Sequence, residues 1–140
     1  MNIPRILMGA VLAGIIYFVG DGIVHGALLH SHWVEILGPN ADQSLHQPGY
    51  FGLYDLFKGF LALWIYAAAR PRLGAGPRTA AIAGLVVWFA CIPVPLLGLL
   101  PMEFFKAAGG ASFVILWSLY AVIPMVLGAI AGAWVYKEPA

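Results

Sequence analysis

Four long apolar segments place the strongest constraint on what this chain can fold into. They cover residues 6–29, 51–69, 79–100 and 112–136. Each is close to the roughly 20 residues that an α-helix needs to cross the hydrocarbon core of a bilayer. The sequence therefore predicts an all-α membrane protein, with residues 1–140 forming a single domain of four transmembrane helices.

Composition supports this prediction and excludes some functions. Of the 140 residues, 62% are hydrophobic and 9% are charged, whereas a soluble domain carries about 25% charged residues. The net charge is only +1 and the basic residues are scattered, so the clustered basic surface of a nucleic-acid-binding protein is missing. No Ser–His–Asp order, Walker loop, GxGxxG or HExxH motif occurs, so no motif favours an enzyme.

The distribution of Lys and Arg predicts the orientation in the membrane. One side of the four segments carries most of the basic residues, namely Arg5, Arg70, Arg72, Arg78 and Lys137. The other side has Lys58 and Lys106 together with acidic residues and three histidines. Because cytoplasmic loops carry an excess of Lys and Arg, we expect a bacterial inner-membrane protein with both termini in the cytoplasm.

Small residues and prolines predict how the helices pack and bend. Glycines at i, i+4 spacing, which let helix backbones approach closely in lipid, occur at Gly22/Gly26 and Gly128/Gly132. We expect these positions to pack against a helix of the same chain or of another subunit. Pro93 and Pro95 should kink the third segment because proline removes backbone donors.

A weak internal repeat relates the two halves of the chain. Pro4-Arg5 before the first segment resembles Pro77-Arg78 before the third, and Trp64-Ile65-Tyr66 resembles Trp134-Val135-Tyr136. The match is consistent with two parallel-repeat helical hairpins, although aromatic residues are common at membrane-helix ends and coincidence explains it equally well. Under this alignment Pro93 and Pro95 coincide with Gly20 and Gly22, which would make a second irregular point there, although glycine and proline are also simply commoner in membrane helices, and that explanation is favoured.

An intramembrane polar site is predicted around Asp21. The carboxyl needs a partner in the membrane, and His25, four residues on, lies one helical turn away on the same face. Lys58 in the second segment could instead snorkel outward or reach across to Asp21 to make a three-membered cluster. Asp55–Lys58 and Glu103–Lys106 are each three residues apart and are interpreted as i, i+3 pairs at the membrane interface.

The histidines leave a metal or haem site open as an alternative. If the first helix continues past Leu29, His32 lies on the same stripe as Asp21 and His25. Imidazole and carboxylate ligands suit Zn, Cu, Fe or Ni, and histidine can ligate haem. His25 and His32 are nevertheless two turns apart, too far to share one ion without ligands from another helix, so no cofactor is predicted.

Residues 31–49 are expected to include a short interfacial helix that ends at Gly38-Pro39.

Two motifs resemble a group of uncharacterised small bacterial integral membrane proteins with four helices. One is Asp-x-x-x-His-Gly in the first helix, here Asp21, His25 and Gly26. The other is Arg-Pro-Arg-x-Gly-x-Gly-Pro-Arg-Thr-Ala in the linker at residues 70–80. The resemblance implies the four-helix architecture and draws attention to Asp21 and His25, but it implies no activity.

Three functional hypotheses follow from the sequence. The first is an accessory or structural subunit of a larger membrane complex of the respiratory or photosynthetic type, with membrane lipids and other subunits or further copies as partners. The second is a small oligomeric transporter or channel with a proton-titratable Asp/His site. The third is a haem- or metal-binding membrane protein.

Overall fold

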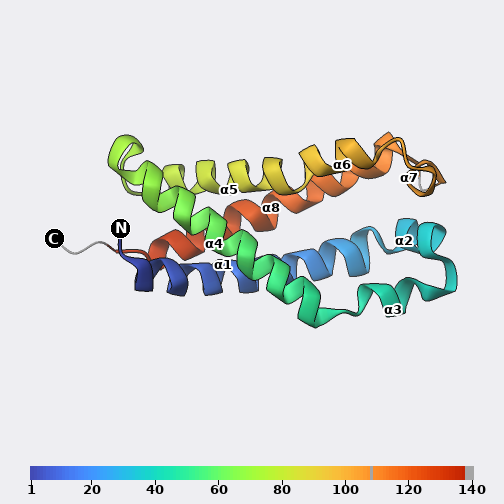
Figure 1. Ribbon diagram of the computed structural model, residues 1–140, viewed down its shortest axis with the longest axis horizontal. Coiled ribbons are helices and arrows are strands. Elements are labelled where there is room, and N and C mark those ends of the chain that lie inside the picture. Colours follow the sequence, from blue (N-terminus) through green and yellow to red (C-terminus); the bar gives the residue numbers. More distant parts are fainter. Residues whose placement is uncertain (108, 138–140) are drawn as a thin grey trace.

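The structure, a computed structural model, describes residues 1–107 and 109–137, and these residues form helices and short connections without a strand (Figure 1). The chain begins with α1 (Ile3–Ile23), which continues into a π-helical turn, η1 (Val24–Leu28). Three short elements follow, namely α2 (His30–Leu37), a 3-10 turn η2 (Gly38–Asn40) and α3 (Ala41–Leu45). The remaining helices are α4 (Pro48–Leu73), α5 (Pro77–Cys91), α6 (Pro93–Leu99), α7 (Glu103–Ala107) and α8 (Ala111–Val135).

Four helical stretches are long and apolar enough to cross a membrane, as predicted. They comprise Ile3–Leu28, Pro48–Leu73, Pro77–Leu99 and Ala111–Val135, with lengths of 26, 26, 23 and 25 residues. The first three begin three, three and two residues earlier than the sequence predicts. Each has a proline in its first turn, where the fixed φ suits a helix and the missing N–H would have no helical partner.

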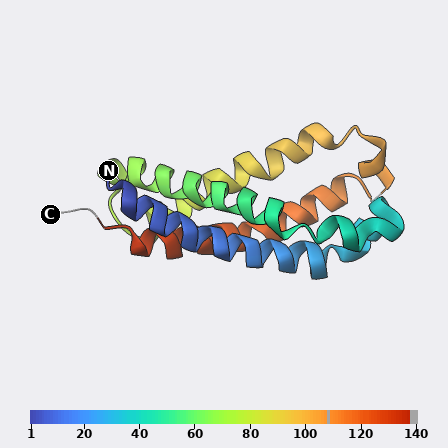
Figure 2. The ribbon, with the colours of Figure 1, turned by 60° about the horizontal axis from the view of Figure 1, so that its bottom comes forward.

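The four spans form an antiparallel bundle in which each helix has two main neighbours. α1 packs against α4 and α8, and α5 packs against the same two helices from the other side. Both termini and the α4–α5 turn lie at one end of the bundle, while α2, α3 and α7 lie at the opposite end (Figures 1 and 2). At the first end, the Asn2 N–H donates to the Tyr136 hydroxyl at 3.2 Å, so the two chain ends are held together.

Close helix contacts depend on glycine, but only some of the predicted glycines take part. A Cβ at Gly132 would lie 2.6 Å from the Gly9 carbonyl oxygen, and one at Gly128 would overlap the Tyr17 ring. Gly128 and Gly132 therefore form the α1–α8 contact. Gly22 and Gly26 have open space where a Cβ would stand, so they do not pack against another helix of this chain, and their packing against another subunit stays a prediction.

Two of the spans are interrupted. The third breaks at Ile92, between α5 and α6, as predicted from Pro93 and Pro95. The irregular point that the repeat alignment would give at Gly20 and Gly22 does not occur, because α1 continues through both and the π-helical turn begins at Val24. The first helix does not run unbroken to His32: Leu29 leaves the helical region, with φ −110° and ψ 7°, before α2 begins.

Candidate functional site: a buried Asp–Lys–Asp cluster

A buried ionic cluster joins α1 to α4. The Lys58 ammonium donates a hydrogen bond to Asp21 Oδ2 at 2.7 Å, and it lies 2.6 Å from Asp55 Oδ1 as an ion pair. The side chains of Lys58 and Asp55 are 2% and 1% exposed, and that of Asp21 is 16% exposed. We refer to Asp21, Lys58 and Asp55 as the ionic cluster.

Local sequence spacing places the three side chains together. Asp55 and Lys58 are three residues apart on α4, which puts them on one face of the helix. Their helix approaches α1 at Gly59, where a Cβ would overlap the Ala10 carbonyl oxygen and lie 2.8 Å from the Gly14 nitrogen. This close approach lets the Lys58 side chain reach Asp21 across the interface. Asp55 is seven residues from the first residue of α4, which is roughly 10 Å along the helix axis, so the cluster lies inside the span.

Aromatic rings surround the ammonium group. Lys58 Nζ lies 4.7 Å from the centre of the Tyr54 ring and 5.9 Å from that of Tyr17, within the range of cation–π attraction. The Tyr17 side chain is fully buried, and its hydroxyl has no hydrogen-bond partner among the described residues. The cluster is therefore a cationic group held between two carboxylates and two ring faces.

The helix break at Ile92 is connected to this cluster. Pro95 has no N–H to offer the Cys91 carbonyl four residues before it, and the Tyr54 hydroxyl donates to that carbonyl at 3.5 Å. Tyr54 thus contacts the Lys58 ammonium with its ring and the break in the third span with its hydroxyl. A displacement of α6 and the charge state of the cluster would both act on this side chain.

The cluster lacks one positive charge. With every group ionised, the two carboxylates and one ammonium carry a net charge of −1. An unbalanced charge in an apolar interior is costly and is normally removed by a proton or a counter-ion. The geometry therefore suits a site that holds one exchangeable proton or one monovalent cation.

Asp21 and His25 are not joined, contrary to the predicted pair. The Lys58 ammonium bonds Asp21, and His25 Nδ1 instead accepts a hydrogen bond from the Trp33 indole N–H at 3.1 Å. The π-helical turn that begins at Val24 replaces the α-helical i, i+4 geometry on which the prediction depended. Because indole is only a donor, Nδ1 carries no proton and the neutral His25 ring keeps its proton on Nε2.

The other histidines lie outside the ionic cluster. His32 stacks on Phe113 with ring centres 5.3 Å apart, while His30 Nε2 donates to Asp42 Oδ1 at 3.0 Å and His46 Nδ1 donates to the Asp42 carbonyl at 2.7 Å. The bond from His30 lowers the pKa of the exposed Asp42 carboxyl. In the part of the chain that the structure describes, no group of three His, Cys, Asp or Glu side chains could hold a metal ion.

The two predicted i, i+3 pairs have different environments. Lys106 donates to Glu103 Oε1 at 2.7 Å, and these side chains are 56% and 86% exposed, in agreement with an interfacial pair. Asp55 and Lys58 also pair, as predicted, but both side chains are buried between the helices. Sequence reasoning overlooked Asp55 as a site residue, although its spacing from Lys58 was a usable signal.

Fold and site together define a polytopic four-helix membrane protein with a buried ionic cluster between its first two spans. No family model, curated protein or solved structure matches the chain in comparisons with known proteins. The resemblance to uncharacterised four-helix membrane proteins stays a prediction, and the geometry of the ionic cluster is the basis for inferring a function.

Proposed function

We propose that this protein is a small membrane transporter or channel in which the ionic cluster takes up and releases a proton. The observation that carries the proposal is the Lys58 ammonium, buried within 2.7 Å of both Asp21 and Asp55. Ionisable groups inside a membrane are costly, and they commonly mark ion pathways or proton relays. A structural ion pair consists of two ionisable groups, whereas three are in contact here.

The two carboxylates differ in exposure, and this difference indicates which one exchanges a proton with the surroundings. Asp55 is almost completely buried, whereas the Asp21 side chain is 16% exposed. In this proposal the proton therefore enters and leaves the cluster through Asp21. Tyr54 links the cluster to the break at Ile92. In transporters, interrupted helices commonly flank the binding site, and here η1 and the α5–α6 break occur in the two spans that flank α4 in the sequence.

Proton flux into proteoliposomes tests this proposal. With a potassium diffusion potential and an internal pH indicator, the wild-type protein should acidify the lumen faster than protein-free liposomes. Asp21→Asn and Asp55→Asn keep the size of each side chain but remove the exchangeable proton, so each should reduce the flux to the protein-free level.

Glu103→Gln is the matched control for these variants. It removes a carboxyl that also pairs with a lysine three residues away, but it does so at an exposed site, so flux should stay at the wild-type value. Unchanged flux in both aspartate variants, measured on protein that elutes as the wild type does in gel filtration, would rule out the ionic cluster as the proton site.

A second proposal is supported by the unpacked glycines. Gly22 and Gly26 lie on the outside of the bundle with no atom near their Cβ positions, a surface that would let another helix approach closely. This arrangement favours an accessory subunit of a larger complex or a homo-oligomer. We place the basic end with both termini in the cytoplasm of a bacterial inner membrane, on the charge distribution alone.

Cross-linking distinguishes this second proposal from an isolated monomer. A cysteine at position 22 or 26, in a Cys91→Ser background, should cross-link to a partner or to a second copy in native membranes. A cysteine at position 123, on the exposed surface of α8, serves as the control and should give no specific product. If none of the three positions cross-links, the glycine surface faces lipid.

A further inference from the structure

The hydrogen bond between Trp33 and His25 joins α2 to the end of the first span. The Trp33 indole N–H donates to His25 Nδ1 at 3.1 Å. In the part of the chain that the structure describes, no other side-chain hydrogen bond joins α2 or α3 to a membrane-spanning helix. A change at this bond would therefore act on the α2–α3 segment, which comprises residues 30–45.

Aromatic contacts place the same bond against α8. The His25 ring lies edge-on to Trp117 with ring centres 4.7 Å apart, and Trp33 lies edge-on to Phe113 at 5.3 Å. Two polar atoms in this aromatic contact, Trp117 Nε1 and His32 Nδ1, are buried and have no hydrogen-bond partner among the described residues. Such atoms reduce the stability of the contact, and both would bind water if α2 moved away from α8.

Both ends of the α2–α3 segment are non-helical. Leu29, between η1 and α2, has φ −110° and ψ 7°. Between α3 and α4, His46 has φ −87° and ψ 61°, and Gln47 has φ −120° and ψ 63°. Hinges in proteins are a few residues of this kind at the ends of elements, where changes in φ and ψ are absorbed. Rotation at these residues would turn the segment away from α8 without unwinding a helix.

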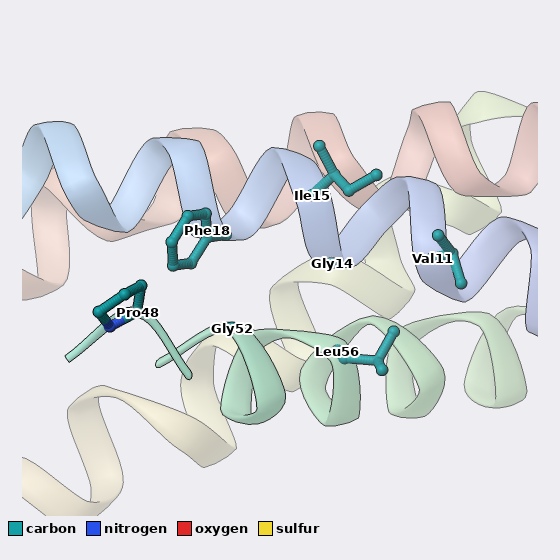
Figure 3. Close-up of a pocket in the computed structure, with 7 residues that line it drawn as sticks. All are labelled: Val11, Gly14, Ile15, Phe18, Pro48, Gly52 and Leu56. Carbon is teal, nitrogen blue, oxygen red and sulfur yellow. The ribbon is translucent and has the colours of Figure 1, made fainter. Parts of the chain in front are cut away.

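The second of these ends adjoins an apolar groove between α1 and α4 (Figure 3). Pro48, which begins α4 directly after Gln47, lines the groove together with Gly52 and, on α1, Phe18. The groove has a volume of about 310 Å³, and a Cβ at Gly52 would lie no closer than 3.9 Å to the Phe18 ring. The start of α4 is therefore packed loosely against α1, which leaves room for a change of chain direction there.

The bond between Trp33 and His25 requires a neutral histidine. An indole N–H is only a donor, so the ring nitrogen that faces it must carry no proton. When histidine is protonated, both ring nitrogens become donors, and turning the ring over cannot restore the bond. An imidazole ordinarily changes its charge at about pH 6.5. Uptake of a proton would thus replace a donor–acceptor contact with two donors that face each other.

We propose that His25 and Trp33 form a proton-controlled latch that opens when His25 takes up a proton from water. The proton binds Nδ1, the indole keeps its own N–H, and the hydrogen bond between the two rings is lost. The α2–α3 segment then turns away from α8 at Leu29. The position of this segment, at the end of the bundle opposite the two termini (Figure 1), would thus depend on pH. The latch goes beyond the proposed function and does not depend on it.

Several charged or titratable side chains lie on the elements around His25. α1, α2 and α8 pack against η1, while Asp21 and Lys58 act on the His25 ring electrostatically. The groups that these elements and α4 carry in the same half of the bundle are Tyr17, Asp21, His30, His32, Glu35, Tyr54, Asp55, Lys58 and Tyr120. Because His30 and His32 are also imidazoles, variants of all three histidines are needed to assign a pH response.

Distances between spin labels measure the opening. Gln43→Cys on α3 and Ile123→Cys on α8 are at exposed positions and would be labelled in a Cys91→Ser background in liposomes. Electron paramagnetic resonance should give one distance at pH 8 and a second, longer distance at pH 5. The ratio of open to closed protein should rise by about tenfold or more, since a buried hydrogen bond is lost and a charged ring is left unpaired.

Two variants hold the latch in one state. His25→Gln keeps an acceptor for the Trp33 indole N–H but cannot take up a proton, so the distance should stay short at both pH values. Trp33→Phe keeps an aromatic ring but has no donor, so the longer distance should be present already at pH 8. His30→Gln and His32→Gln are the matched controls, because neither histidine bonds Trp33, and both should keep the wild-type response to pH.

The latch and the proposed function fail separately. A wild-type distance that is the same at pH 8 and pH 5, or a pH response that survives His25→Gln, would overturn the latch. Proton flux that depends on Asp21 and Asp55 in a protein without a pH-dependent distance would overturn the latch alone. Opening that depends on His25, in a protein without proton flux, would support the latch and overturn the transport proposal.

Discussion

Replacing Lys58 with methionine is expected to destabilise the folded bundle by about 3–5 kcal/mol, the usual range when one partner of a buried ion pair is removed. Methionine fills a similar volume, so packing around Tyr17 and Tyr54 changes little. The large effect comes from Asp55 and Asp21, which would be left in an apolar interior without their shared cation. Titration with sodium dodecyl sulfate, followed by circular dichroism, measures the loss.

Two comparisons show whether the buried charge causes this destabilisation. Combining Lys58→Met with Asp21→Asn and Asp55→Asn removes all three charges and should recover most of the lost stability, since replacing a whole buried ionic group is often nearly neutral. Lys106→Met breaks the exposed pair with Glu103 and should cost less than about 1 kcal/mol. Equal losses in Lys58→Met and Lys106→Met would contradict the burial of the cluster.

The stability of Lys58→Met should also depend on pH. Once the ammonium is gone, the two carboxyls can relieve their repulsion and desolvation only by taking up protons. The folded variant then binds more protons than its unfolded chain, so its stability should rise relative to wild type as the pH falls. The same titration at a series of pH values measures this, and a deficit that grows at low pH would contradict it.

Gly59→Ala is expected to destabilise the bundle by about 1–3 kcal/mol, the range for overpacking a close contact. The added methyl group would overlap the Ala10 carbonyl oxygen and lie 2.8 Å from the Gly14 nitrogen. Both atoms belong to the backbone of α1 and cannot move aside by rotating a side chain. The substitution should therefore separate α1 from α4 and weaken the contact through which Lys58 reaches Asp21.

Gly22→Ala is the matched control for Gly59→Ala. Both replace a glycine inside a membrane-spanning helix with alanine, but a Cβ at Gly22 meets nothing within 4 Å. Its stability in detergent should be unchanged or slightly higher, because alanine is the better helix former. Proton flux through Gly59→Ala should fall together with stability, and a Gly59→Ala protein as stable as wild type would contradict the close α1–α4 contact.

The sequence was a good guide wherever the cause is local. The length of the four apolar segments determined the four spans and hence that both termini lie at one end of the bundle. The break at Ile92 follows from Pro93 and Pro95, which lack the N–H groups that would continue α5. These features depend on chain length and backbone chemistry, which are the same whatever the neighbouring helices are.

The sequence was a poor guide to which side of each helix is buried. In a soluble helix, the apolar side faces the core, but a membrane helix is apolar toward both lipid and protein, so the pattern carries little information about its neighbours. Gly128 and Gly22 are each followed by another glycine four residues later, yet one packs against Tyr17 and the other is open. His25 likewise accepts a hydrogen bond from Trp33 and does not pair with Asp21, because the π-helical turn η1 changes the helical spacing.

What the sequence by itself determined is therefore a four-span helical membrane protein with two carboxyls, a lysine and a histidine in its apolar segments. Only the tertiary structure decided that Asp55 is buried, that Lys58 joins it to Asp21 and that His25 stands apart. The physical reason is that a buried charge takes its partner from whichever helix packs closely enough. In this chain that is the contact of α4 with α1, made possible by the missing side chain of Gly59.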